Sequence, residues 1–409
     1  TNGKMTADGN ADLTYTWTED ALDTTTYATS ENGTAITNQL SCADPNLYDG
    51  VEETVTWLSR SDWNGTLPTE TVKLTLTEML KKDLKDIRYD PADYESIEMP
   101  TLGAKNGVKL YDMIGLDYND PKWDELLDQM TFDEMNSLIG DAFHWTMPVK
   151  SVEAPGTRDE NGPQGLTASL LGNDKSQLTA TAFTSEDVMA ATFNTEIMTE
   201  IGKVIGNNCL EADIACLYGP GNNIHRTPYG GRNFEYYSED GFLSGMMSAY
   251  EVRGMQSKGV IPTVKHFAAN EQETHRSING DSSWLTEQAL REIYLKGFEI
   301  AVKTGEARGV MSSFNRIGTR WTGGDYRLIT QILRNEWGFK GFVICDFNTI
   351  PQYMIPRQMF YAGGDLDLAT LESSMWTDCD SSDNGDAIVL RNATKNLVYA
   401  LVNSNAMNA

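Results

Sequence analysis

Polar side chains suited to chemistry stand directly after short apolar runs at several points in this sequence. Lys265 and His266 end the run 260–266, and Asp346 ends the run 341–346. A carboxylate in such a position can act as a nucleophile, while an ammonium and an imidazole can hold the hydroxyl groups of a neutral substrate such as a sugar. If the runs are parallel strands of one sheet, these groups meet at a common edge.

Asp346 allows two interpretations on the residues alone. The run 341–345 has the composition of a buried strand, and a carboxylate at its end is poorly solvated unless a cation or donor pairs with it, as in a catalytic site. Alternatively, Asp346 caps the next helix through Asn348 and Thr349. Lys265 and His266 also allow two interpretations. A buried lysine that pairs with an acidic residue looks identical in sequence to a lysine that binds a substrate.

Arginines and aromatic residues near these runs add candidate binding groups. The guanidinium groups of Arg226, Arg232 and Arg276 can bind vicinal hydroxyls, although surface salt bridges to nearby glutamates are the commoner role. Aromatic side chains can stack on a sugar ring but more often pack in a core, and the candidates are Trp145, Phe314, Trp321 and Phe347. Phe347, directly past a strand end, is the best placed of them.

Metal and cysteine chemistry are disfavoured by spacing. His225, His266 and His275 show neither HxxxH nor HExxH spacing, so we expect no metal site. No glycine-rich phosphate loop follows a strand, which argues against a nucleotide site. The 5 cysteines form no CxxC pattern and are expected to be buried free thiols. Cys345 lies inside an apolar strand and should point away from the side of Asp346, which argues against a thiol nucleophile.

Alternating strand and helix patterns after Pro121 supply the framework for these residues. Apolar runs at 214–218, 260–266, 309–314 and 341–346 predict short buried strands, and periodic patterns at 121–130, 131–139, 197–205, 290–301 and 325–333 predict helices. Thr131 and Glu134 have the spacing of a capping box. The alternation predicts an α/β fold, and the number of units favours a (β/α)8 TIM-like barrel over an open sheet.

The first hundred residues differ in character. They are rich in Thr, Asn, Asp and Gly, with strand-like runs at 14–17 and 55–58, one helical stretch at 75–87, and proline-containing pairs at 90–91 and 99–100. We therefore expect a β-rich appendage and linker at 1–100 and the barrel at 101–409. Because the chain starts at Thr1 without a methionine or apolar leader, we expect a processed product or a fragment.

The charge balance excludes some partners. The 32 basic and 59 acidic residues give a net charge of -27, which repels nucleic acid and anionic membranes. We therefore expect no nucleic acid partner. No stretch approaches the ~20 apolar residues of a membrane-spanning helix.

Three segments resemble motifs of glycoside hydrolase family 3. They are Gly-Gly-Arg-Asn-Phe-Glu-Tyr-Tyr-Ser-Glu-Asp (230–240, preceded by Gly-Pro-Gly-Asn-Asn-Ile-His-Arg), Lys-His-Phe-Ala-Ala-Asn-Glu-Gln-Glu-Thr-His-Arg (265–276) and Leu-Arg-Asn-Glu-Trp-Gly-Phe-Lys-Gly-Phe-Val-Ile-Cys-Asp (333–346). The resemblance runs from about residue 122 to 405 and includes Ala-Gly-Gly-Asp-Leu-Asp-Leu (362–368). It implies a (β/α)8 barrel that performs retaining hydrolysis of β-glucosides or related β-glycosides, without a metal or organic cofactor.

The resemblance also implies roles for individual residues. Asp346 matches the nucleophile that forms a glycosyl-enzyme intermediate. The hydroxyl-binding positions of the innermost sugar subsite match Arg232, Lys265, His266 and Arg276, and Phe347 matches an aromatic wall. Two binding positions depart from the family pattern, since Asn161 replaces an aspartate and Phe314 replaces a tyrosine.

A further departure concerns the general acid/base, which in the family sits on an α/β sandwich domain that normally follows the barrel. The segment before Lys122 resembles the connecting region of a permuted class in which the barrel is C-terminal. We therefore expect the acid/base to come from a sandwich domain, a second polypeptide or a neighbouring subunit of a homo-oligomer. Within the chain, the conceivable substitutes are Glu52, Glu53, Asp62 and Glu160. The alternative is a catalytically silent carbohydrate-binding or assembly module.

Overall fold

A six-stranded sheet forms the centre of the structure. The computed structural model describes residues 4–5, 15–16, 25, 28–47, 55–57, 75–85, 97–167, 180–348, 353–369 and 377–408. The strand order is β11-β8-β6-β5-β4-β3, in which β3 is antiparallel to β4 and the other neighbours are parallel. The strands are β3 (Trp145–Thr146), β4 (Thr157–Asn161), β5 (Cys216–Gly221), β6 (Ile261–Phe267), β8 (Gly309–Ser312) and β11 (Phe342–Ile344). The α/β class expected from the sequence is confirmed.

The central strands are apolar because they are buried throughout. Every residue of β5, β6, β8 and β11 is buried, as expected for parallel strands without a solvent-facing side. These strands overlap the four predicted apolar runs. Two of them end earlier than predicted, β8 at Ser312 and β11 at Ile344, so Ser313 and Asp346 lie in the segments just beyond the strands.

The sheet is curled, and the segment beyond β11 reaches the helix that precedes β3. Residues 365–368 continue it beyond β11, where the Cys345 N–H donates to the Leu366 carbonyl at 3.0 Å. The Asp367 N–H in turn donates to the Ile139 carbonyl at 3.0 Å, and the chain then leads into β3. The described residues thus form a curled sheet, and the eight-stranded count of a (β/α)8 barrel stays a prediction.

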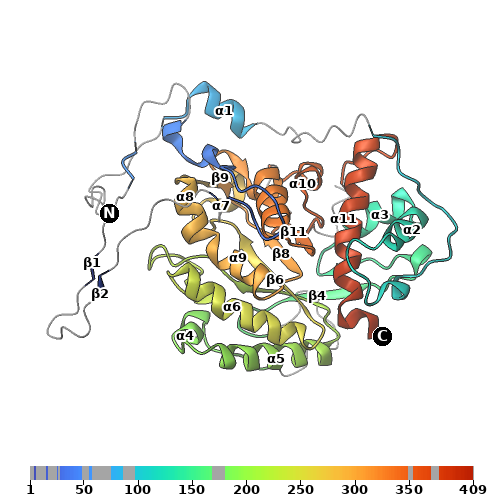
Figure 1. Ribbon diagram of the computed structural model, residues 1–409, viewed down its shortest axis with the longest axis horizontal. Helices are drawn as coiled ribbons and strands as arrows, with labels where there is room; N and C mark the ends of the chain where they lie inside the picture. Colours follow the sequence, from blue (N-terminus) through green and yellow to red (C-terminus); the bar gives the residue numbers. More distant parts are fainter. Residues whose placement is uncertain are drawn as a thin grey trace.

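Helices pack around the sheet (Figure 1). Their bounds are α2 (Lys122–Gln129), α3 (Phe132–Gly140), α4 (Glu186–Ala190), α5 (Thr195–Ala212), α6 (Gly241–Gln256), α7 (Arg276–Asn279), α8 (Glu287–Ala289), α9 (Lys296–Lys303), α10 (Pro356–Ala362) and α11 (Asn384–Val402). Two π-helical stretches, Leu290–Tyr294 and Arg327–Glu336, complete them. The predicted capping box of α3 is confirmed, because Glu134 N donates to Thr131 Oγ1 and Thr131 N donates to Glu134 Oε2.

Glycines let α5 and α6 pack in close contact below the sheet (Figure 1). A β-carbon at Gly202 would lie 2.2 Å from the Glu251 carbonyl oxygen, and one at Gly254 would lie 2.3 Å from the Thr199 carbonyl oxygen. Any larger residue at these positions must therefore push the helices apart. On the other side of the domain, α11 packs against α2 and α3.

Part of the N-terminal region packs onto the domain. Leu40 and Ala43 are fully buried in the apolar core that also contains Leu285. The Glu287 carboxylate accepts the N–H groups of Gln39 and Leu40 at 2.8 and 2.7 Å. Residues 28–47 therefore contribute to the core beside α8, while the predicted boundary at residue 100 stays a prediction.

The remaining described elements are short. Strands β1 (Lys4–Met5) and β2 (Tyr15–Thr16) pair antiparallel, so the predicted run 14–17 contains a strand. Helix α1 (Glu78–Leu84) lies within the predicted 75–87. Residues 55–57 form no strand, although the sequence predicts one at 55–58, and residue 58 lies outside the described residues. A small sheet joins β7 (Ser282–Ser283), β9 (Arg316–Ile317) and β10 (Arg320–Trp321).

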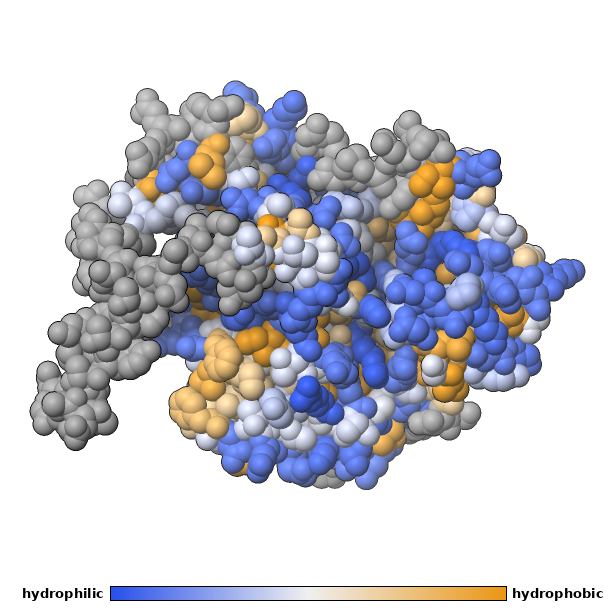
Figure 2. All heavy atoms as spheres, viewed as in Figure 1, coloured by the Kyte–Doolittle hydropathy of each residue, from blue (hydrophilic) through white to orange (hydrophobic). Residues whose placement is uncertain are grey.

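The surface is mostly hydrophilic on the face shown in Figure 2, in keeping with the net charge of -27. Among the described residues, none of the helices combines the length and apolar character needed to cross a membrane.

Candidate active site

The predicted site residues come together at the carboxyl ends of the parallel strands. Asn161 ends β4, Lys265 and His266 lie near the end of β6, and Asp346 follows β11 by two residues. Arg232 lies in the connection from β5 to α6. Because parallel strands present their carboxyl ends on one rim, residues far apart in the sequence meet there.

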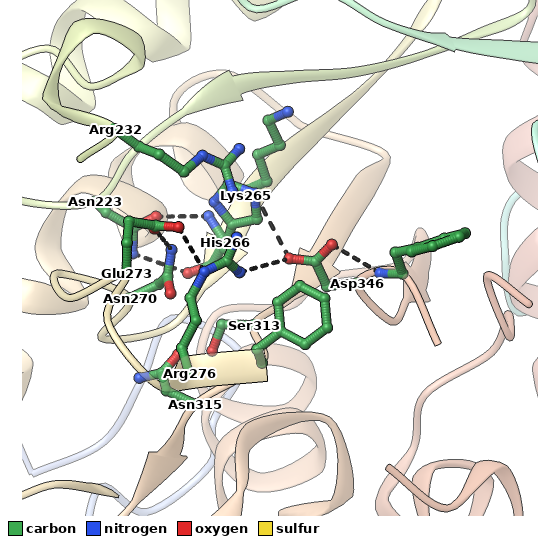
Figure 3. Close-up of polar contacts among 12 residues, drawn as sticks. Asn223, Arg232, Lys265, His266, Asn270, Glu273, Arg276, Ser313, Asn315 and Asp346 are labelled. Atoms are coloured by element: carbon green, nitrogen blue, oxygen red, sulfur yellow. Dashed lines mark hydrogen bonds and ion pairs between the residues drawn. The ribbon is translucent and has the colours of Figure 1, made fainter. Parts of the chain in front are cut away.

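The Asp346 carboxylate is buried and faces side-chain nitrogens of His266 and Arg276 and the backbone N–H of the next residue (Figure 3). Its Oδ1 accepts the Phe347 N–H at 2.7 Å. Its Oδ2 lies 3.8 Å from His266 Nε2 and 3.6 Å from Arg276 Nη1. These separations are too long for hydrogen bonds, and Oδ2 is a buried oxygen without a hydrogen-bond partner among the described residues.

The helix-capping interpretation of Asp346 finds little support from Asn348. The Asn348 side chain donates to the Met354 carbonyl at 3.2 Å and to Asp367 Oδ1 at 2.9 Å. It is therefore engaged with other groups, while Thr349 lies outside the described residues.

Arg276 is held from two sides. Its Nε donates to Glu273 Oε2 at 2.5 Å, and its guanidinium lies 4.5 Å from the centre of the Phe314 ring. Phe314 is 7% exposed. The Phe314 ring therefore supports Arg276 by a cation–π contact rather than forming an open platform.

Lys265 and Arg232 share one carboxylate. Lys265 Nζ lies 3.5 Å from Glu235 Oε2 and donates to Asn161 Oδ1 at 2.7 Å, while Arg232 Nε donates to Glu235 Oε1. Burial lowers the pKa of Lys265, although Glu235 opposes this. Burial acts to raise the pKa of Glu235, but Lys265 and Arg232 together hold it below its ordinary value. Two cations facing one carboxylate leave this side of the site with an excess of positive charge.

His266 is neutral in this environment. Burial lowers its pKa well below the ordinary value, and the nearby cations Arg232, Lys265 and Arg276 lower it further. Its backbone is fixed by Asn223, whose Oδ1 accepts the His266 N–H at 2.7 Å and whose Nδ2 donates to the His266 carbonyl at 2.9 Å. A neutral imidazole offers one donor and one acceptor to its surroundings.

The aromatic candidates differ in the solvent exposure of their side chains. Phe347 is 37% exposed beside Phe143, with ring centres 5.6 Å apart. Trp321 is buried, and its Nε1 donates to the Ser313 carbonyl at 2.9 Å. Trp145 is part of β3. Of the four candidates, Phe347 is the one that combines a place beside Asp346 with an exposed ring.

Other candidates have structural partners or lie elsewhere. Glu160 is buried, with Oε1 3.4 Å from Arg158 Nη2 and Oε2 3.5 Å from His144 Nδ1. Arg226 is exposed on the loop after β5. Cys345 donates to Asp367 Oδ1 at 3.3 Å, and burial raises the pKa of its thiol well above the ordinary value. All 5 cysteines are free.

Three supporting residues escaped the sequence analysis as site residues: Glu273, Asn270 and Tyr236. Glu273 stands three residues before Arg276, and the i, i+3 spacing of opposite charges is a signal that sequence reasoning can use. Tyr236 reaches His266 only through the tertiary fold, so spacing gives no sign of it, whereas Asn270 stands three residues before Glu273. Among the described residues, no group of three His, Cys, Asp or Glu side chains is arranged to hold a metal ion.

The chain is similar in sequence to a known family and to several known proteins. Residues 167–363 match the family model described as the glycosyl hydrolase family 3 N terminal domain. A β-glucosidase from Ruminococcus albus is 51% identical over 160 residues, which cover 39% of this chain and 17% of that protein. Thermostable β-glucosidase B from Acetivibrio thermocellus is 35% identical over 251 residues, covering 60% of this chain and 33% of that protein.

A solved structure gives the same result for the fold. The structure of β-glucosidase 3B from Thermotoga neapolitana in complex with glucose has a TM-score of 0.61 and 35% sequence identity, covering 70% of this chain and 43% of that one. The chain thus spans well under two thirds of the length of the relatives that it matches.

Proposed function

Residues 167–363 of this chain are a glycosyl hydrolase family 3 N-terminal domain, and from that premise we propose that the protein is a retaining β-glycosidase acting on β-glucosides or related β-linked sugars. The observation that carries the proposal is the buried, unpartnered Oδ2 of Asp346 facing His266 and Arg276 at the end of β11. The β-glucosidases to which the chain is similar support the choice of substrate class.

In the proposed mechanism, Asp346 Oδ2 attacks the anomeric carbon while the glycosidic C–O bond breaks and the leaving oxygen takes a proton from the general acid. The resulting covalent glycosyl-enzyme intermediate is then hydrolysed by a water molecule that gives its proton back to the same group. The Phe347 N–H holds Oδ1, so that Oδ2 is the oxygen left free for the new bond. Arg276 Nη1 and His266 Nε2 face Oδ2 at 3.6 and 3.8 Å. They also offer donors to sugar hydroxyls on the same side.

Sugar binding is assigned to the remaining rim residues. Lys265, Arg232 and Asn161 present donors to the hydroxyls of the innermost sugar, and the exposed ring of Phe347 forms one wall. Hydrogen bonds that shorten as the sugar acquires oxocarbenium character lower the barrier, because they bind the transition state more tightly than the ground state.

Retaining hydrolysis requires a second carboxyl group roughly 5 to 5.5 Å from the nucleophile. Glu235 and Glu273 are tied to Arg232 and Arg276, and Glu160 is buried near Arg158. Glu52, Glu53 and Asp62 lie outside the described residues. We therefore propose that the acid/base comes from an α/β sandwich domain or from another polypeptide, including a neighbouring subunit.

One finer feature of the fold belongs to the same proposal. The curled sheet is proposed to be part of a complete (β/α)8 barrel, supported by the hydrogen bond from the Asp367 N–H beyond β11 to the Ile139 carbonyl in α3, the helix that precedes β3.

The test is covalent trapping with a 2-deoxy-2-fluoro-β-glucosyl compound that carries a good leaving group, followed by intact-mass analysis and peptide mapping. The expected adduct lies on Asp346 and is absent in Asp346→Asn. Asp367→Asn is the matched control, because Asp367 is a neighbouring buried carboxyl that faces Cys345 and Asn348, and it should still be labelled. Glucoside binding without any adduct would instead favour the silent carbohydrate-binding module.

A further inference from the structure

A buried chain of polar groups links His266 to Arg276 behind the candidate nucleophile. Tyr236 Oη lies 3.3 Å from His266 Nδ1, and Asn270 Nδ2 lies 3.1 Å from Tyr236 Oη. The same Nδ2 lies 3.2 Å from Glu273 Oε1, and Glu273 Oε2 accepts from Arg276 Nε. Figure 3 shows the part of this chain that runs from Asn270 through Glu273 to Arg276.

The chemistry of the groups fixes the direction of these hydrogen bonds. The Glu273 carboxylate that pairs with Arg276 accepts hydrogen bonds only, so Asn270 must turn its amide nitrogen toward it. An amide nitrogen carries two hydrogens, and the second one points at Tyr236 Oη. Tyr236 therefore accepts from Asn270, which leaves its own proton free for His266 Nδ1.

The protonation states of the two rings agree with this direction. Burial raises the pKa of Tyr236 well above its ordinary value, so the phenol keeps its proton. Burial lowers the pKa of His266, so the imidazole carries one proton and not two. If Nδ1 accepts from Tyr236, that proton resides on Nε2, which faces Asp346 Oδ2 at 3.8 Å.

We propose that Tyr236 and Asn270 are positioning residues that hold His266 in the tautomer with its proton on Nε2, so that an N–H and not a lone pair faces Asp346. The other tautomer would place the Nε2 lone pair against the carboxylate, where it repels the nucleophile and offers no donor to a sugar. The catalytic consequence rests on the proposed glycosidase function, whereas the tautomer is a property of the protein without substrate.

Nuclear magnetic resonance of the 15N-histidine-labelled protein tests the tautomer directly. The chain contains only 4 histidines, and His266→Gln identifies the signals of the ring in question. We expect the wild-type protein to show a protonated Nε2 and an unprotonated, hydrogen-bonded Nδ1 at His266. A proton on Nδ1 would overturn the proposal whatever the activity of the protein.

Tyr236→Phe removes the proposed donor, and Tyr237→Phe is its matched control. Tyr237 is also buried, but its hydroxyl donates to Glu251 Oε2 at 2.6 Å. The His266 Nδ1 resonance should move in Tyr236→Phe toward the position of a nitrogen without a hydrogen bond, and it should stay in place in Tyr237→Phe. An unmoved resonance in Tyr236→Phe contradicts the proposal, and Asn270→Ala offers a second variant with the same expected direction.

Kinetic measurements distinguish a failure of the proposed glycosidase function from a failure of the proposed positioning role. With an aryl β-glucoside, kcat/KM should fall about tenfold in Tyr236→Phe, the effect of losing one hydrogen bond that orients a reacting group. The expected tautomer in a wild-type protein without glycosidase activity would refute the proposed function alone. Activity in a protein whose His266 is protonated on Nδ1 would refute the positioning role alone.

Discussion

Arg276 Nη1 lies 3.6 Å from Asp346 Oδ2, and both atoms are buried without a hydrogen-bond partner among the described residues. Buried polar atoms that make no hydrogen bond are costly unless another group satisfies them. A hydroxyl group placed between the two atoms can donate to the carboxylate and accept from the guanidinium. The gap therefore has the donor and acceptor pattern of a bound alcohol.

Glu273 keeps that gap open by holding Arg276 Nε at 2.5 Å. We expect Glu273→Gln to weaken this charge-assisted bond and let Arg276 close on Asp346, which lowers kcat/KM for an aryl β-glucoside about tenfold. Glu299→Gln, in an ion pair with Lys296 and Lys303, is the control and should retain the activity. Equal kinetics of the two variants would show that Glu273 has no such role.

Asn161 sets the charge of the site next to Lys265. Asn161→Asp adds a carboxylate 2.7 Å from Lys265 Nζ, where an amide oxygen now accepts. The added negative charge should disfavour anionic substrates. We expect the ratio of kcat/KM for an aryl β-glucoside over the matching β-glucuronide to rise about tenfold, and an unchanged ratio would place Asn161 outside substrate contact.

Glu251 should make stability depend on pH. Burial raises the pKa of Glu251 from 4.5 to about 8, so the folded state binds this proton more tightly than the unfolded state. The resulting stability is complete below pH 4.5 and is lost as pH rises toward about 8. Glu251→Gln still accepts from Tyr237 but does not ionise, so its melting temperature should gain several degrees on that of the wild type across this range. A difference in melting temperature between the two proteins that does not change with pH would contradict the raised pKa of Glu251.

Gly202 tests the contact of α5 with α6. A β-carbon there would lie 2.2 Å from the Glu251 carbonyl oxygen, so Gly202→Ala should cost about 1–3 kcal/mol of unfolding free energy. Gly297→Ala in α9 is the control, since its nearest neighbour would be at 3.4 Å. Chemical denaturation of both variants measures their unfolding free energies. An equal loss of unfolding free energy in the two variants would point to a cause other than the contact of α5 with α6.

Periodicity was sufficient to predict four central strands and the helices α1, α2, α3, α5 and α9, but it did not predict the long helices α6 and α11. Continuous apolar runs correspond to β5, β6, β8 and β11 because these strands are buried throughout. The amphipathic pattern at 325–333 predicted a helix but not its π-helical hydrogen bonding at Arg327–Glu336. Side-chain periodicity reports which face is buried, and it does not distinguish i to i+4 from i to i+5 bonding.

The residues that the structure brings together in the candidate site were predictable, but most of the contacts among them were not. Polar residues past strand ends identified Asp346, Lys265 and His266, because parallel strands present them on one rim. The contact of Lys265 with Asn161 joins residues 104 positions apart. Neither this contact nor the link from Tyr236 to His266 has a local sequence signal. The first joins the ends of β4 and β6, which lie on either side of β5, and the second depends on the path of the chain from β5 to α6.

Phe347 supplies two things from one position: an exposed ring and the backbone N–H that holds Asp346 Oδ1. The N–H is provided by any amino acid except proline. Mutation can therefore reshape the wall of the site at position 347 while the carboxylate keeps its orientation. The part of the site proposed to recognise the sugar and the part proposed to break its bond are thus free to evolve separately.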